Sequence, residues 1–528
     1  IRILSLRLID FLAQLEDFQK KLWLKKKFVV ETHYCITLDR IPEQFYPEIA
    51  ANERQREEWV KLFAIDEIQG DMATAGYSAP LTIEFLKDNA FLVLDTALFS
   101  DQFKQTLIQA IEGLDERAGG LLVHAENSHA LRLMNGKLRD QIQCIYIDPP
   151  YNTGSDGFRY KDAYPHASWL SMIDERLRLA HTLAAEQTAL FVSLDDNEQA
   201  VFRQAADAVW GRENFVATAI WQKIFSPKNS ARHFSEDHDF VLVYARDGAT
   251  WTPRLLPRTA EMEARYSNPD NDPRGPWTSG DVSARNPYSE GRYAITCPSG
   301  RDIPGPPPGT YWRVSRTRFD ELNRDGRIWW GESGDNIPRL KRFLSEVKQG
   351  RVPQTIWPYA EVGHTQDAKK ELLACIKLDA EEVVFQTPKP TALLRRVLAL
   401  ATHPESSDWV LDFFAGSATT AHAVIQQNRE DRGQRRYALV EMEDYFDQLV
   451  LPRVKKAIYA SEWADGKPMA RDGISHCFKY IRLESYEDCL NNLALNTRDE
   501  LVCKQGDTAF QRDYLLRYML EVETHGSQ

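Results

Sequence analysis

The feature that most constrains the fold is a short apolar run, residues 144–147, that leads directly into the heptapeptide DPPYNTG at residues 148–154. The run has the length and composition of a buried parallel strand. Two consecutive prolines then hold the chain in an extended turn. An acidic side chain, backbone carbonyls and an aromatic ring are therefore fixed at the carboxyl edge of a sheet, where α/β proteins bind ligands.

The candidate catalytic residues in this segment are Asp148, Pro149, Pro150 and Tyr151. A carboxylate and a carbonyl can accept the two hydrogens of an exocyclic amine, while Tyr151 stacks on the ring that carries the amine. The amine of adenine is a poor nucleophile because its lone pair is delocalised into the ring. Hydrogen bonds to Asp148 and to the Pro149 carbonyl can localise that lone pair toward an incoming methyl group. The alternative is a purely structural turn in which Asp148 caps the following segment.

A second motif, VLDFFAGSATT at residues 410–420, reads as a strand that runs into a small-residue turn and then a helix. Small residues let the backbone approach a ligand closely, and amides at the helix start can meet a carboxylate such as that of methionine. Glu441 ends the next strand about 25 residues after Gly416, where an acid can accept both hydroxyls of a ribose. A nicotinamide dinucleotide fits that spacing too, but the loop lacks a full GxGxxG; a β-α-β unit without ligand is the other alternative.

Five regions are expected along the chain. Residues 1–105 alternate apolar and charged positions at helical spacing, which predicts a mainly helical accessory region. Residues 106–224 and 376–460 carry the two motifs and form the halves of one sheet domain. Residues 225–375 are interrupted by Gly and Pro and hold six of the thirteen tryptophans, which predicts loops and small strands. Residues 461–528 form a polar C-terminal extension, expected to be truncated.

The charge distribution bears on nucleic-acid binding. The net charge of −12 argues weakly against it, because phosphate contacts need Lys and Arg. Residues 223–360 are an exception, with about 21 Lys and Arg against about 17 Asp and Glu. Exposed aromatics among arginines suit a groove-reading surface, although a small β-rich domain also needs Trp for its core, and surface arginines are often only solvated. The candidate DNA contacts are Arg232, Arg285, Arg313, Arg316 and Arg339.

Several classes of protein are disfavoured. The sequence contains no run of 18 or more apolar residues and no secretory signal, which predicts a soluble, cytoplasmic protein without a membrane span. Seven cysteines are scattered singly, so neither a zinc site nor a disulfide framework is expected, and we predict no metal. The chain begins at Ile1 rather than Met, so a piece of a longer polypeptide is one expectation.

Together the two motifs resemble the β-class amino-group DNA methyltransferases, in which the catalytic loop precedes the recognition region and the cofactor loop. Among these, the chain resembles the modification subunits of type III restriction systems, over about residues 120–460. The resemblance implies an α/β, Rossmann-like S-adenosylmethionine-dependent sheet with an inserted target recognition domain, at residues 225–375, and a helical N-terminal region. FVSLDDNE and FSEDHDFVLVYAR also look like the family's later sheet strands.

The resemblance also implies roles for individual residues. Asp148 to Tyr151 correspond to the adenine-N6 site, and QTPKP places Gln386, Thr387, Lys389 and Pro390 near the methionine end of the cofactor. One departure is Ala418, where the family usually has a second glycine; a methyl group there is tolerated if φ is negative. The predicted cofactor-binding residues are Asp412, Phe414, Ala415, Gly416, Ser417, Glu441, Thr387 and Lys389.

The predicted function is therefore methylation of N6 of a flipped-out adenine in double-stranded DNA, with S-adenosylmethionine as cofactor. Family resemblance implies an ATP-dependent restriction subunit as partner, and a homodimer. Methylation of cytosine N4 is an alternative, because the amine chemistry is the same; Asp148, where Ser is common in the cytosine group, favours adenine. A catalytically inactive DNA-specificity subunit is another alternative, supported by Ala418, and an RNA substrate is also left open.

Overall fold

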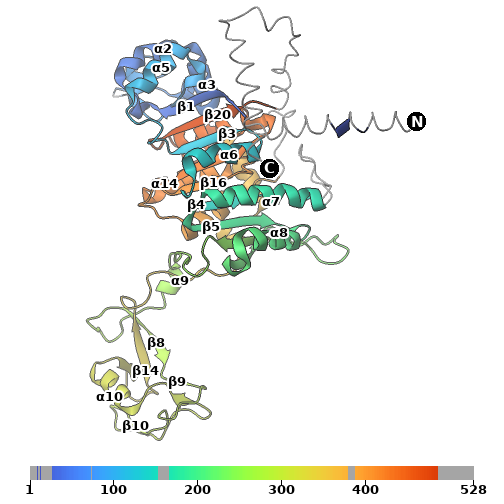
Figure 1. The fold of residues 1–528 in the computed structure, drawn as a ribbon. Helices are drawn as coiled ribbons and strands as arrows, with labels where there is room; N and C mark the ends of the chain where they lie inside the picture. The colour runs from blue at the N-terminus through green and yellow to red at the C-terminus, as the bar shows by residue number, and fades with distance from the viewer. Residues whose placement is uncertain are drawn as a thin grey trace, which may run out of the picture. The chain divides into compact units, whose positions relative to one another are not determined.

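The computed structural model describes residues 27–72, 74–152, 166–377 and 387–485, together with residues 9, 12 and 13. The chain divides into two compact units (Figure 1). Unit 1 is formed by Ile1–Pro253 and Gln354–Gln528, and unit 2 by Arg254–Pro353. The predicted motifs at residues 148–154 and 410–420 both belong to unit 1.

Unit 1 is built around an eleven-stranded sheet in its described part. Its strand order is β15-β6-β7-β5-β4-β16-β17-β3-β20-β1-β2. The strands are β1 (Val29–Thr37), β2 (Val93–Asp95), β3 (Gly120–His124), β4 (Ile142–Ile147), β5 (Ala184–Leu194), β6 (Phe215–Gln222), β7 (His238–Ala245), β15 (Ile356–Trp357), β16 (Trp409–Asp412), β17 (Arg436–Glu441) and β20 (Cys477–Leu483).

The centre of this sheet is parallel. Strands β5, β4, β16, β17, β3 and β20 run in one direction, whereas β7 and β1 are antiparallel to their neighbours. β4 and β16 lie side by side, with Ile145 opposite Leu411, although they are far apart in sequence. Consequently the two predicted motifs, each at the carboxyl end of its strand, emerge next to each other. The predicted α/β, Rossmann-like sheet is confirmed.

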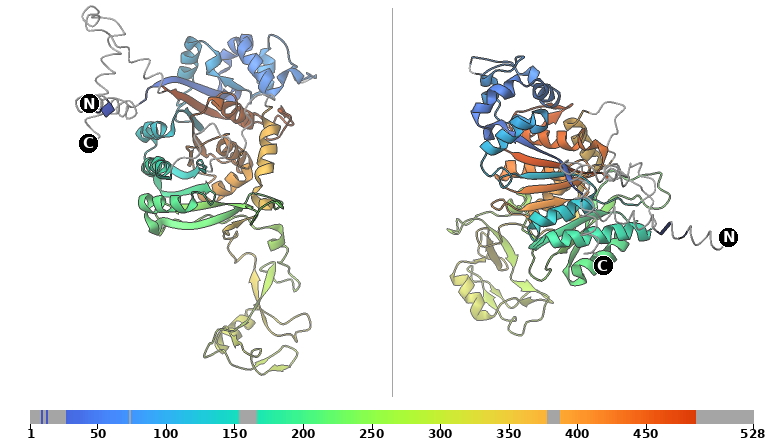
Figure 2. Two further views of the ribbon diagram at one scale, coloured as in Figure 1. Left: turned by 90° about the vertical axis from the view of Figure 1, so that its right-hand side faces the viewer. Right: turned by 45° about the horizontal axis from the view of Figure 1, so that its top comes forward.

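Helices cover both faces of the sheet (Figure 2). The connections from β3 to β4 and from β4 to β5 proceed toward one edge of the sheet, and those from β16 to β17 and from β17 to β20 toward the other edge. Because such connections are right-handed, the two sets of helices lie on opposite faces of the sheet. One face carries α6 (Asn127–Leu138), α7 (His166–Leu183) and α8 (Gln199–Ala206), and the other α13 (Thr391–Ala401), α14 (Thr419–Asp431) and α15 (Val450–Tyr459).

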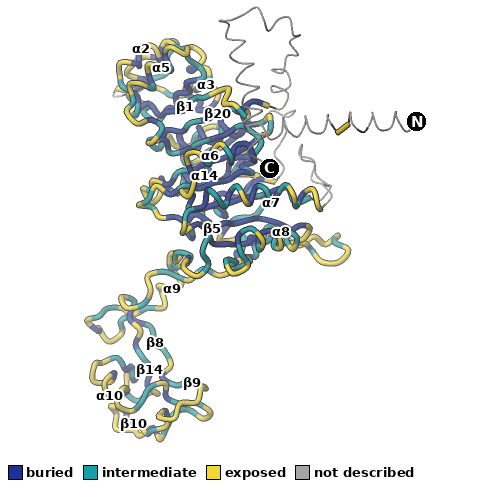
Figure 3. Tube along the Cα trace, viewed as in Figure 1, coloured by how far each residue is buried: buried dark blue, intermediate teal, exposed yellow. Residues whose placement is uncertain are grey.

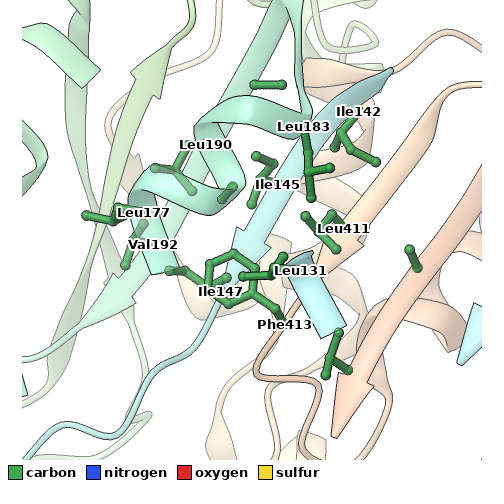
Figure 4. Packing of buried hydrophobic residues seen from close by; sticks show 14 of the residues in the cluster. Leu131, Ile142, Ile145, Ile147, Leu177, Leu183, Leu190, Val192, Leu411 and Phe413 are labelled. Carbon is green, nitrogen blue, oxygen red and sulfur yellow. The ribbon is translucent and has the colours of Figure 1, made fainter. Parts of the chain in front are cut away.

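The core lies between the central strands and these helices, where buried residues are concentrated (Figure 3). On the face of β4 toward α7, Ile145 and Ile147 pack against Leu411, Leu177 and Leu190 (Figure 4). A central parallel strand is buried on both faces, which explains why residues 142–147 are almost uniformly apolar. The rigid strand holds Asp148 at a fixed point of the sheet edge.

The N-terminal region differs from the prediction of a mainly helical accessory region. It contains α2 (Tyr46–Ala51), α3 (Glu53–Phe63), α4 (Ile83–Asp88) and α5 (Asp101–Ala110), but the helical prediction is wrong for β1 and β2. β1 pairs with both β20 and β2 and so extends the main sheet. Extended pairing at a sheet edge outweighs the weak helical periodicity of this segment.

The first part of the predicted C-terminal extension also belongs to the sheet. After the short strands β18 (Trp463–Ala464) and β19 (Lys467–Pro468), β20 inserts between β3 and β1. Residues 477–483 are therefore a structural part of unit 1 and not an appendage. Residues 486–528 lie outside the described residues.

Unit 2 has the short strands and loops expected from its Gly and Pro content. It is smaller than the predicted region of residues 225–375, because β7, β15, α11 (Tyr359–Val362) and α12 (Thr365–Cys375) belong to unit 1. Its elements are α9 (Ala260–Glu263), β8 (Trp277–Asp281), β9 (Ser283–Ala284), β10 (Ile295–Thr296), β11 (Asp302–Ile303), β12 (Tyr311–Trp312), α10 (Arg316–Arg324), β13 (Ile328–Trp329) and β14 (Arg339–Phe343).

The tryptophans of residues 225–375 mostly fill cores. Trp312 and Trp330 pack with Phe319 in the centre of unit 2, and Trp251, Trp277 and Trp357 are buried as well. Trp329 is the half-buried exception among these six. The sequence allowed these tryptophans to form either a core or a row of exposed rings. The structure supports a small aromatic core. Within the described residues, no helix combines the length and apolarity needed to cross a bilayer.

Candidate active site

Local contacts fix the turn that follows β4. The indole Nε1 of Trp169, on α7, donates a 2.9 Å hydrogen bond to the carbonyl of Pro150. Asn152 adopts a φ of 60°, and its Nδ2 donates to Oε1 of Glu198 at 2.6 Å. Glu198 is fully buried and is the N-cap residue of α8. The catalytic candidates are therefore held from both sides; Thr153 and Gly154 lie outside the described residues.

The carboxylate of Asp148 has two different environments. Lys389 Nζ donates a 2.6 Å hydrogen bond to Oδ2. Oδ1 is buried and accepts no hydrogen bond from the residues that the structure describes. Lys389 Nζ also lies 5.0 Å from the ring centroid of Tyr151 and 5.9 Å from that of Trp221. A buried oxygen without a donor is costly, so Oδ1 is suited to accept a hydrogen from a bound amine.

Burial and charge act in opposite directions on this carboxyl. Burial raises the pKa of Asp148, and the ammonium of Lys389 opposes that rise. A second ion pair lies nearby, because Lys223 Nζ donates to Oδ1 of Asp239 at 2.6 Å and Asp239 is the second residue of the antiparallel β7, at the same edge. The Tyr151 hydroxyl donates a long, 3.5 Å bond to Asp239 Oδ2. Burial raises the pKa of Tyr151 well above its usual range, so its ring stays uncharged.

The predicted cofactor turn is braced from within by Asp412. Its Oδ1 accepts the amide of Phe414 at 3.1 Å, and its Oδ2 accepts the hydroxyl of Thr420 at 2.5 Å. Burial raises the pKa of Asp412 to about 7, and the negative charges of Asp148 and Glu441 add to the rise. Asp412 therefore closes the turn onto α14 in this structure.

Glu441, predicted to accept ribose hydroxyls, joins β17 to the same turn. Its Oε2 accepts the amide of Gly416 at 2.7 Å, and its Oε1 accepts the amides of Met442 and Glu443 at 2.9 and 3.1 Å. Each carboxylate oxygen can accept more than one hydrogen bond, so these bonds are compatible with a further ligand. The side chain is buried, and its direction is fixed by the backbone around it.

Only part of the cofactor turn is accessible to solvent. Phe414 and Gly416 are half-buried, whereas Ala415 and Ser417, also predicted to bind cofactor, are buried beneath them. Thr387 is exposed, and Gln386 lies outside the described residues. The surface of this turn that a ligand can reach is therefore formed by Phe414 and Gly416. These residues and Asp148 occupy adjacent strand ends, an arrangement that fits a flat nucleoside carrying a reactive group beside the carboxylate.

Ala418 contradicts the expectation of a negative φ. It has a φ of 62° and a ψ of 31°, is fully buried, and donates its amide to the carbonyl of Ala415 at 2.9 Å. The tight turn into α14 requires the left-handed conformation at this position, which costs a residue with a Cβ roughly 1–2 kcal/mol. The surrounding contacts have to offset that strain.

The predicted DNA contacts do not form one cluster within a unit. Arg232 is exposed in unit 1, between β6 and β7. The other four are exposed in unit 2, where Arg316 pairs with Asp320 and Arg339 with Asp281. In the part of the chain that is described, no group of His, Cys, Asp and Glu is arranged to hold a metal ion.

Sequence reasoning missed several residues of the site. Lys223 directly follows β6, and Asp239 is the second residue of β7. The antiparallel pairing of these two strands places both residues at the carboxyl edge of the sheet. Trp169 and Trp221 gave no signal beyond their apolar surroundings. Arg453, whose guanidinium contacts Ser417 and Thr419 of the cofactor turn, was also missed. Its signal was a charged residue within the otherwise largely apolar helix at residues 450–459.

Comparison with known proteins adds an independent observation. The family described as DNA methylase matches residues 142–451, which include both motifs. This chain belongs to the DNA methylase family. Among its relatives, the type III restriction-modification enzyme StyLTI Mod subunit of Salmonella typhimurium is 30% identical over 422 residues, covering 74% of this chain and 61% of the relative. The EcoP15I Mod subunit of Escherichia coli is 26% identical, covering 61% of this chain and 58% of the relative.

The chain spans about three fifths of the length of the curated relatives it matches. Among solved structures, the PvuII DNA methyltransferase (cytosine-N4-specific) is 11% identical, with a TM-score of 0.34 over 64% of this chain and 86% of that chain. The family assignment accordingly rests on the sequence match.

Proposed function

We propose that this DNA methylase is a site-specific methyltransferase that transfers a methyl group from S-adenosylmethionine to N6 of an everted adenine in DNA. The observation that carries the proposal is the meeting of two strand ends. β4 delivers Asp148, whose buried Oδ1 lacks a donor among the described residues, and the adjacent β16 delivers the half-buried Phe414 and Gly416. An amine acceptor and a nucleoside surface are thus side by side.

Each residue of the tetrad has a distinct part in the proposal. Oδ1 of Asp148 accepts one hydrogen of the amine, the Pro149 carbonyl accepts the other, and the ring of Tyr151 stacks on the base. Lys389 opposes the rise in the Asp148 pKa that burial causes, and so favours the carboxylate form, which can take the proton that N6 loses when the N–C bond forms. S-adenosylmethionine supplies an activated methyl group on a sulfonium.

The cofactor would be held by the turn and its supports. Phe414 and Gly416 offer the reachable surface, Glu441 is placed to receive a ribose, and Asp412 keeps the turn closed. Lys389 and Thr387 border the methionine end. The eversion of the target base costs a few kcal/mol, which stacking on Tyr151 helps to offset.

Recognition of the DNA sequence is assigned to the inserted region, with unit 2 as its compact part. Arg285, Arg313, Arg316 and Arg339 are exposed there, and each bidentate contact to a base contributes roughly 1–3 kcal/mol of discrimination. Exchanging residues 254–353 for those of a relative should change the methylated sequence. An unchanged sequence would place recognition elsewhere.

The assembly is proposed from the relatives. The names of the StyLTI and EcoP15I relatives are those of Mod subunits of type III restriction-modification enzymes. By analogy this chain would be the modification component of such a system, a cytoplasmic homodimer that works with an ATP-dependent restriction subunit.

The decisive experiment combines two measurements on DNA from cells that express the chain. Single-molecule sequencing reports the modified base and its context, and digestion to nucleosides with mass identification reports the product. N6-methyladenine in one sequence context supports the proposal, and N4-methylcytosine would select the alternative. DNA from cells that express the Asp148→Asn variant is the matched control.

A second candidate is a catalytically inactive DNA-specificity subunit. Its support is the left-handed Ala418, which strains the cofactor turn. Calorimetry with S-adenosylmethionine separates the two candidates, because the inactive subunit would not bind it.

A further inference from the structure

Arg453, on α15, is a fully buried cation, and most of its hydrogen bonds go to the cofactor turn. Its Nη1 donates to the carbonyl of Ser417 at 3.0 Å, to Ser417 Oγ at 2.8 Å and to Thr419 Oγ1 at 2.9 Å. A guanidinium is retained in a protein interior only where it is well partnered. A fourth bond runs from Nε to Nδ1 of His422, on α14, at 3.3 Å. Three of the four bonds therefore go to two residues of one turn, which makes this turn the main partner of Arg453.

The other side of the guanidinium faces a second segment of the site. Arg453 Nη2 lies 4.0 Å from Oε1 of Glu371 and makes no hydrogen bond within the described residues. Glu371, on α12, accepts the amide of Thr391 at 3.3 Å and also its hydroxyl. Thr391 begins α13 two residues after Lys389. Arg453 and Glu371 therefore connect the turn at residues 417–419 with the segment that carries Lys389.

The residue between the two that Arg453 holds is the strained Ala418. A left-handed residue with a Cβ persists only where the surrounding structure fixes it. Arg453 donates hydrogen bonds to the carbonyl of Ser417, immediately before Ala418, and to the hydroxyl of Thr419, immediately after it. These bonds oppose relaxation of the Ala418 φ toward negative values.

We propose that Arg453 is a positioning residue that holds the turn at residues 417–419 in the conformation that binds S-adenosylmethionine. The inference rests on the proposed function for the identity of the ligand. It explains how this chain tolerates alanine at a position with positive φ, and it predicts that the need for Arg453 depends on the side chain at position 418.

The test is a double-mutant cycle with Arg453→Met and Ala418→Gly. Methionine removes every donor without leaving a buried charge, and glycine removes the strain. The matched control is Lys456→Met, which removes a buried cation of the same helix whose Nζ donates to the carbonyls of Cys375 and Gly466 at 2.8 and 2.7 Å. The readouts are the Kd for S-adenosylmethionine by calorimetry, and amide exchange of residues 413–424 in the free protein.

We expect Arg453→Met to weaken binding by about tenfold and to speed amide exchange in the turn, whereas Lys456→Met changes neither while lowering the melting temperature. Ala418→Gly should recover about half of the loss on a logarithmic scale in the Arg453→Met background, and change the wild type by less than about twofold. The proposal is overturned if Arg453→Met binds like the wild type, if glycine has the same effect in both backgrounds, or if Lys456→Met weakens binding equally.

Two further cases need a separate measurement. If Arg453→Met does not fold, Arg453→Lys replaces it; a single ammonium should give an intermediate Kd, and a Kd equal to that of the wild type would overturn the proposal. If the wild-type chain itself does not bind S-adenosylmethionine, the proposed function fails. In that case unchanged amide exchange in the Arg453 variant would also remove the positioning role.

Discussion

Lys389 Nζ donates a 2.6 Å hydrogen bond to Oδ2 of Asp148, across 241 positions of sequence. The pair joins the catalytic turn after β4 to the segment that leads into α13. It satisfies one oxygen of the carboxylate and leaves Oδ1 toward the site. It also sets the charge of the carboxylate, because the ammonium opposes the rise in the Asp148 pKa that burial causes.

Replacing Lys389 by Met should shift the pH dependence of methylation. Without the ammonium, burial acts unopposed, so the pKa of Asp148 rises and the carboxyl is protonated over a wider range. The acidic limb of kcat/KM against pH should therefore move to higher pH. Lys87→Met, which removes a surface cation paired with Glu43, is the control. A profile that coincides with that of the wild type would contradict this account.

Asp148→Asn should abolish most methylation while the protein still folds. The amide keeps the shape of the carboxylate but loses its charge and one acceptor, so we expect kcat to fall by about a hundredfold or more. Binding of S-adenosylmethionine, measured by calorimetry, should change little. Asp174→Asn removes a half-buried carboxylate paired with Arg178, outside the site, and should leave kcat unchanged. Near-normal methylation by the Asp148 variant would remove the catalytic assignment.

Tyr151 should act through its ring rather than its hydroxyl. The bond from the hydroxyl to Asp239 is long, at 3.5 Å, so Tyr151→Phe should retain most activity. Tyr151→Ala removes the stacking surface, worth about 1–3 kcal/mol per base, and should lower kcat/KM by roughly 10- to 100-fold. Initial rates on duplex DNA measure both. Equal losses in the two variants would instead assign the role to the hydroxyl.

Asp412 should make stability depend on pH. Its folded-state pKa is raised to about 7 from a usual value of 3.8, so the folded state binds the extra proton. The stability linked to this group is fully present below about pH 4 and is lost as pH rises through about 7. The Asp412→Asn variant has no carboxyl at this position and does not lose stability in this way. The free energy of unfolding of the variant minus that of the wild type should therefore be larger at pH 8 than at pH 4.5. Urea denaturation at the two pH values provides the check, and an equal difference at both would contradict the prediction.

Much of the site could be predicted because its signals are local. The prolines after β4 and the small residues after β16 act on the backbone of their own segments, and each follows a strand that is buried and therefore apolar. That the two strands are neighbours in the sheet was shown only by the structure. The conformation of Ala418 could not be predicted, because its φ is imposed by the turn it enters.

The sequence by itself determined the α/β class, the two strand ends that form the site, and the residue types gathered there. Only the tertiary structure decided which partners meet. Lys389 pairs with Asp148, Arg453 reaches Ser417, and β1 pairs with β20 to extend the sheet. The physical reason is that backbone propensity and apolar periodicity act within a few residues, whereas a buried ion pair or an edge pairing depends on segments that approach only when the whole chain has packed.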